Sequence, residues 1–174
     1  MSINLTNIYN NLINLTRNKT LFKNLNSDET FSSRLLIFLI HFAFFLKFYK
    51  ENNSKDIMQK IYDYNFWQIE ISIREIGYGD VSINKKMKDY LNLFHKIILD
   101  IADWDNFSGD KKSDFFINYF DNKLNSSYFV EYFDKYQEFL KNNNLNIFTK
   151  DKICLLYTSP SPRDSFRSRM PSSA

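Results

Sequence analysis

Charged side chains and glycines gather in one segment of the sequence, residues 66–88. Its centre, REIGYGD, begins at Arg74 and ends at Asp80, and it places an arginine beside the carboxylates of Glu75 and Asp80. Residues of these types form ion pairs that can hold a turn or bind a charged partner. Three lysines follow within about two helical turns: Lys85, Lys86 and Lys88. They could face an anionic partner, such as an acidic protein segment or lipid headgroups, or form a solvated face.

Gly77 and Gly79 are two of the chain's three glycines. Glycine adopts positive φ without strain, so the pair predicts a backbone shape that other residues adopt with difficulty. Gly77 fits the left-handed position that ends a helix. We therefore expect a turn between two helices at this point.

Arg34 and His41 form a second candidate group, because a separation of seven residues places them on the same face of a helix. With an acid such as Glu70 or Asp80 they could build a ligand-binding or enzymatic pocket. The alternative is a core histidine satisfied by a polar neighbour. The sequence has no Glu-x-x-His or His-x-x-x-His pair, so we expect no metal and no cofactor.

The elements that must position these residues are helices, and the sequence predicts an all-α fold with a single compact domain of about six helices. The apolar run 35–46 is too short to span a bilayer and predicts a central core helix. We expect that helix to begin near Ser27 or Asp28, both good N-cap residues. The other helices are predicted by apolar spacing: around 5–15, 54–76, from Ser82 to 101, 115–120 and 128–140. Alternating isoleucines at 69, 71 and 73 would suit a strand, but the length of the segment favours a helix.

The composition changes at Cys154, after which lie the only cysteine and all three prolines. Residues 154–174 resemble the translation of a sequencing adapter, so we assign 1–153 to a truncated natural domain and expect 154–174 to be disordered. Ile153 stands at the junction and can share a codon with the adapter, so Lys152 is the last residue attributed entirely to the natural protein. Without the tail, Lys+Arg falls from 23 to 20 and Asp+Glu from 20 to 19, so the net charge falls from +3 to +1.

That nearly neutral charge gives no indication of nucleic-acid binding, and the absence of cysteine before residue 154 excludes disulfides there. The N-terminal residues lack the basic start and apolar run of a signal peptide. We therefore expect a cytoplasmic protein.

The central segment resembles the signature of the ubiquinol-cytochrome c chaperone family, an Arg-Glu-x-Gly-x-Gly-Asp motif followed by a hydrophobic residue, a lysine and Met-Lys. The matching residues are Arg74, Glu75, Gly77, Gly79, Asp80, Ile83, Lys85, Met87 and Lys88. Upstream, Arg34, His41 and Leu46-Lys47 resemble a second family segment. Two positions differ from the family pattern: Glu70 stands where Asp is usual, and Phe94-His95-Lys96-Ile97 stands where Phe-Tyr-Gly-Arg is expected.

The resemblance implies a non-enzymatic assembly factor that binds newly made cytochrome b, or another subunit of the bc1 complex, and promotes assembly of that complex. It also implies a place in the cytoplasm or peripherally on the inner face of the cytoplasmic membrane. Lys85, Lys86 and Lys88 would steer the protein towards anionic lipid or client loops. Arg74 would bond Asp80 or Glu75 across the turn, or these residues would only lock the turn. A pocket around Arg34 and His41, or a generic helix-bundle interaction module, remains the alternative.

Overall fold

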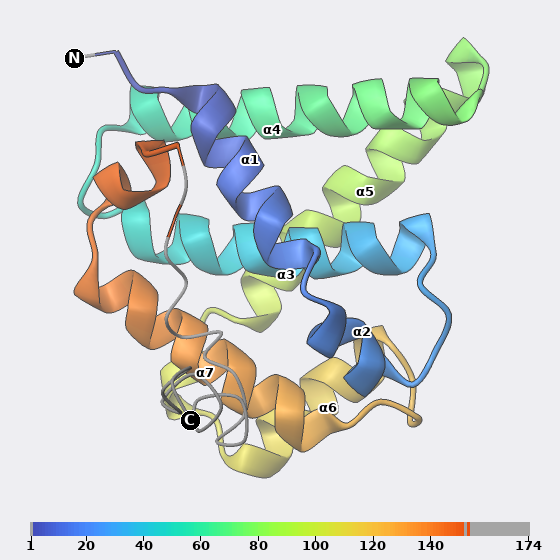
Figure 1. Ribbon diagram of the computed structural model, residues 1–174, viewed down its shortest axis with the longest axis vertical. Coiled ribbons are helices and arrows are strands. Elements are labelled where there is room, and N and C mark those ends of the chain that lie inside the picture. Colours follow the sequence, from blue (N-terminus) through green and yellow to red (C-terminus); the bar gives the residue numbers. More distant parts are fainter. Residues whose placement is uncertain (1, 152, 154–174) are drawn as a thin grey trace, which may run out of the picture.

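The computed structural model describes residues 2–151 and 153, and these residues form a bundle of α-helices (Figure 1). No strand occurs in this part of the chain, which confirms the predicted all-α fold. Seven α-helices and two short 3-10 helices follow in order: α1 Leu5–Thr16, α2 Lys19–Leu25, α3 Phe31–Tyr49, α4 Lys55–Ile76, α5 Asp80–Asp100, η1 Trp104–Asn106, α6 Gly109–Tyr119, α7 Ser126–Asn142 and η2 Leu145–Thr149. The expectation for 154–174 lies outside the described residues.

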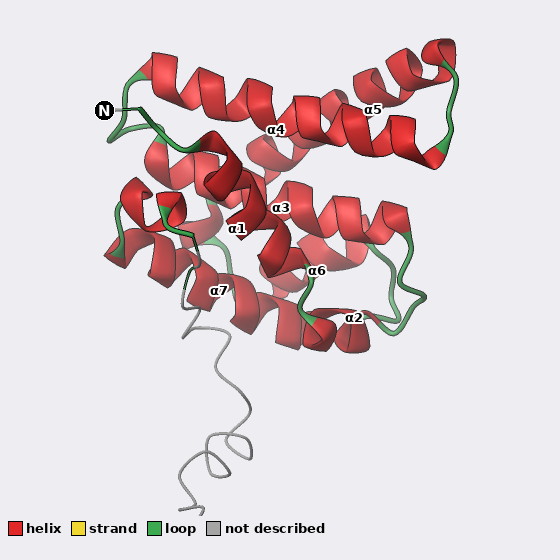
Figure 2. Ribbon diagram, turned by 45° about the horizontal axis from the view of Figure 1, so that its top comes forward, coloured by secondary structure: helices red, strands yellow, loops and turns green. Residues whose placement is uncertain are grey.

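Helix α3 is the centre of the molecule, as the apolar run 35–46 predicts. Helices α1, α5 and α7 all pack against it. In Figure 2 the α4–α5 pair lies on one side of α3, and α2, α6 and α7 lie on the other. Since neighbours cover it on several sides, nearly every side chain from Leu35 to Phe45 is buried.

The length of α3 differs from the twelve-residue apolar run that the sequence suggests, because polar turns extend it to 19 residues. By length and composition it is the one helix in the described part of the chain that could cross a membrane. Its burial between α1, α5 and α7 is that of a core helix.

Helix starts differ from the sequence expectations at two points. Helix α3 begins at Phe31 rather than near Ser27 or Asp28, because Thr30 and Ser33 form a reciprocal capping box. Helix α5 begins at Asp80 rather than near Ser82, with Gly79 as its N-cap. Helix α2, which the sequence analysis did not predict, has only seven residues and so shows little periodicity.

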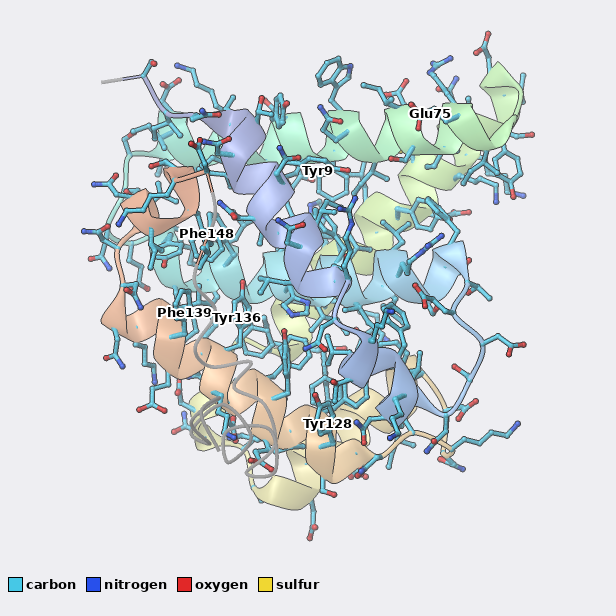
Figure 3. The ribbon with its side chains drawn as sticks, viewed as in Figure 1. Tyr9, Glu75, Tyr128, Tyr136, Phe139 and Phe148 are labelled. Carbon is cyan, nitrogen blue, oxygen red and sulfur yellow. The ribbon has the colours of Figure 1, made fainter. Side chains whose placement is uncertain are left out.

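Aromatic side chains from α3, α6 and α7 fill the lower half of the core. Phe44 stacks on Phe133 with ring centroids 5.3 Å apart and meets Trp104 edge-on at 5.2 Å. Tyr136, labelled in Figure 3 with Tyr128 and Phe139, donates a hydrogen bond from its hydroxyl to the carbonyl of His41. The aromatic stripe along α7 is therefore largely core.

Candidate functional site

The turn between α4 and α5 depends on one glycine rather than two. Gly77 adopts φ +102° and ends α4, with its N–H donating to the carbonyl of Arg74 at 3.0 Å. Gly79 has φ −73° and ψ 160°, an extended conformation open to any residue. The expectation that both glycines hold an unusual backbone shape is therefore correct for Gly77 and wrong for Gly79.

Arg74 joins the two helices of this hairpin. Its Nη1 donates to Asp80 Oδ1 at 2.8 Å, and its Nη2 and Nε donate to Glu70 Oε1 at 2.9 and 3.3 Å. These bonds, first to Glu70 and then to Asp80, raise the pKa of Arg74. The predicted bond to Asp80 is present. The second partner is Glu70, one helical turn before Arg74, and not the exposed Glu75.

The exposed side of α5, which we call the outer face, is cationic. Successive exposed positions recur at intervals of three and four residues: Val81, Asn84, Lys85, Lys88, Asn92, His95, Lys96 and Leu99. Asp89, four residues after Lys85 and three before Asn92, is also exposed and borders these positions, so the three lysines of this face outnumber one neighbouring acid. Lys96 lies 3.9 Å from Asp100. In the described part of the chain, Lys85 and Lys88 have no carboxylate within ion-pair distance.

Exposed apolar side chains accompany these lysines. Val81 is 86 % exposed at the start of the outer face, and Leu99 is 74 % exposed near its end. At the turn, Ile76 is also exposed, and Tyr78 lies under Lys86, whose Nζ is 4.4 Å from the ring centroid. Sequence reasoning missed these apolar residues, although Val81 and Leu99 fall among polar residues of α5 on the helical wheel.

The remaining motif residues of α5 differ in burial. Met87 is partly buried and packs against the core. Lys86 is also half-buried, because it lies over the ring of Tyr78. At the position where the family pattern expects an arginine, Ile97 is buried. Its neighbour Lys96 extends over the ring of Tyr119 at 4.8 Å from the centroid. Lys85 and Lys88 are thus the motif cations that lie free on the surface.

His41 lies in a closed core. It is fully buried, with Nδ1 2.7 Å from the carbonyl of Ile37 and Nε2 2.8 Å from the Tyr132 hydroxyl. The carbonyl can only accept, so Nδ1 carries the proton and Nε2 accepts from Tyr132. Burial lowers the pKa of His41 to about 4. This histidine is neutral and satisfied by its neighbours.

The structure does not bring Arg34 and His41 together. Arg34 is half-exposed, 3.8 Å from Glu29, and lines a cavity of about 370 Å³ whose lining does not include His41. Glu70 and Asp80, the acids considered as partners for a pocket, are both bonded to Arg74 instead. The predicted pocket around both residues is therefore not formed.

Residues 2–151 and 153 contain no cluster of three or more His, Cys, Asp or Glu side chains arranged to hold a metal ion. At the α4–α5 turn one arginine is paired with two carboxylates, which leaves a net charge of −1 there. Such a group can hold a turn in shape and present the helices beside it.

Comparison with known proteins identifies one family. The profile of the family described as ubiquinol-cytochrome C chaperone matches residues 23–111, just over half of the 174-residue chain. The match includes all of α3, α4 and α5, and so the Arg74 contacts and the outer face. Searches of curated proteins and of solved structures gave no match.

Proposed function

The chain belongs to the ubiquinol-cytochrome C chaperone family, and from that premise we propose that it is a non-enzymatic assembly factor that binds newly made cytochrome b and promotes assembly of the bc1 complex. The observation that carries the proposal is that the family match spans the whole α4–α5 hairpin. The hairpin presents an exposed helical surface, with Arg74 bonded across its turn to Asp80.

The outer face of α5 is the surface that we assign to the client, meaning the bound cytochrome b. Lys85 and Lys88 are exposed and lack a carboxylate partner in the described residues, so they can attract acidic client loops over a distance. Val81 and Leu99, at the two ends of the face, offer apolar contacts beside these charges. Arg74 fixes the start of α5 through Asp80 and thereby sets how this face is presented.

The same arrangement supports a peripheral position on the inner face of the cytoplasmic membrane. Exposed apolar groups at the α4–α5 turn, Ile76 and Val81, lie next to lysines. Basic residues near an anionic membrane surface contribute about 1 kcal/mol each, and that attraction weakens with salt. A chaperone held there would meet cytochrome b as the client enters the bilayer.

Co-purification from the membranes of the source cells tests this function. The tagged protein should recover unassembled cytochrome b, and the double charge reversal Lys85→Glu/Lys88→Glu should lose it. A matched control, Lys23→Glu/Lys123→Glu, changes the net charge equally at exposed positions on other elements and should retain the client. A preparation of the unaltered protein that contains no bc1 subunit would contradict the proposal.

A further inference from the structure

An apolar cavity of about 370 Å³ lies where α1 ends, between the first half of α3 and the second half of α4. Its walls are mostly apolar side chains: Ile13, Phe22, Phe31, Leu35, Phe38 and Ile69. Tyr9, labelled in Figure 3, contributes a ring that meets Phe38 edge-on with centroids 5.9 Å apart. This volume lies within the range of about 300–1,000 Å³ that is typical of small-molecule sites.

Cations dominate the exposed part of the cavity lining. Arg17, Lys19 and Arg34 are exposed, and Glu29 is the single acid among the lining residues. Glu29 lies 3.8 Å from Arg34, while neither Arg17 nor Lys19 has a carboxylate within ion-pair distance in residues 2–151 and 153. An apolar interior with a net positive opening is complementary to a molecule with an apolar body and an anionic end.

We propose that this cavity binds one amphipathic anion, an acyl chain that carries a carboxylate or phosphate headgroup. The chain would lie against the phenylalanine and isoleucine walls, with the headgroup at Arg17 and Arg34. A peptide helix fits less well, because a cylinder about 10 Å across fills this volume with roughly one turn. None of the lining residues belongs to the outer face of α5, so this site is independent of the proposed client surface.

Calorimetric titration of the full chain with dodecanoate, below its micelle concentration, tests the proposal. Dodecanoate should bind, and dodecanol, which has the same chain without the charge, should bind at least tenfold more weakly. Decanoate is two methylenes shorter and should also bind roughly fifteenfold more weakly, because each buried methylene contributes a factor of about four. Equal binding of dodecanoate and dodecanol would overturn the assignment.

Two variants place the ligand in this cavity. Ser72→Phe puts a ring into the cavity from α4 and should abolish binding, and Arg17→Gln/Arg34→Gln should weaken it at least tenfold by removing charge-assisted hydrogen bonds. Lys123→Gln, at an exposed position between α6 and α7 and outside the cavity lining, is the control and should bind as the unaltered protein does. Thermal melts show whether each variant folds. If the double arginine variant does not fold, Arg17→Gln alone replaces it. Unchanged affinity in the folded cavity variants would refute the site.

Dihexanoyl phosphatidylglycerol and dihexanoyl phosphatidylcholine distinguish the source of the anion. Binding of dodecanoate alone identifies a free fatty acid, and binding of the phosphatidylglycerol in addition identifies an anionic lipid. Both outcomes support an amphipathic anion. Equal binding of the zwitterionic phosphatidylcholine would contradict the role of the arginines.

Discussion

Acid should destabilise this protein through His41 before most carboxylates are protonated. Burial lowers the pKa of His41 from its ordinary 6.5 to about 4 in the folded protein. Between these pH values the unfolded chain binds more protons than the folded one, so the free energy of unfolding increases with pH. The contribution of neutral His41 to the free energy of unfolding is complete above pH 6.5 and is lost as the pH falls to about 4. At about 1.36 kcal/mol per pH unit, it amounts to about 3 kcal/mol.

Urea unfolding at pH 7, 5.5 and 4 measures this loss when the protein is compared with His41→Gln. The variant should be less stable than the unaltered protein at pH 7. Because glutamine cannot titrate, the free energy of unfolding of the variant should fall by about 3 kcal/mol less than that of the unaltered protein on going to pH 4. The matched control is Phe45→Leu, a buried substitution on the same helix that removes no titratable group and should retain the pH dependence of the unaltered protein. Equal pH dependence in the protein and in His41→Gln would refute the closed environment that the structure gives His41.

Three further substitutions test the packing by urea unfolding at pH 7. Gly77→Ala places a side chain at φ +102° and should cost about 1–2 kcal/mol, whereas Gly79→Ala, at φ −73°, should change stability by less than about 1 kcal/mol; equal effects would contradict the turn geometry. Tyr132→Phe leaves Nε2 of His41 without its donor and should cost about 1–3 kcal/mol; no loss would mean that the bond is absent. Phe44→Ala opens a cavity in the aromatic core and should cost about 3–5 kcal/mol; a loss below 1 kcal/mol would argue against that packing.

The arrangement of the core could be predicted because it depends on strong sequence patterns. A run such as 35–46, apolar at every position but His41, must be buried wherever it occurs in a water-soluble fold, so α3 was recognisable as the central helix. Gly77 was equally recognisable, since its left-handed conformation is one that few other residues adopt.

Features that depend on which side chains meet were not predictable to the same degree. Helical spacing places Glu70, four residues before Arg74, on the same face and Glu75 on another, whereas the bond to Asp80 depends on how the turn at Gly77 brings α5 back beside α4. The start of α3 depended on competition among Ser27, Asp28 and Thr30, which the hydrogen bonds to Ser33 decide.

The cavity lined by Arg34 was the feature least open to prediction from the sequence. Four helices form its walls, and one of them, α2, was too short to predict. Arg34 and His41 share a spacing that suggests one site, yet the packing of α7 encloses His41 while Arg34 remains at the surface. Spacing along a helix therefore identified candidate residues, and the neighbouring helices determined what each one contacts.

Site-specific photo-crosslinking in the source cells tests the proposed role most directly. A photoreactive residue replaces Lys88 on the outer face of α5 or, as the control, the exposed Glu138 on α7. The proposed function predicts an adduct with newly made, unassembled cytochrome b from position 88 and none from position 138. No cytochrome b adduct from position 88, or equal adducts from both positions, would contradict a client surface on α5.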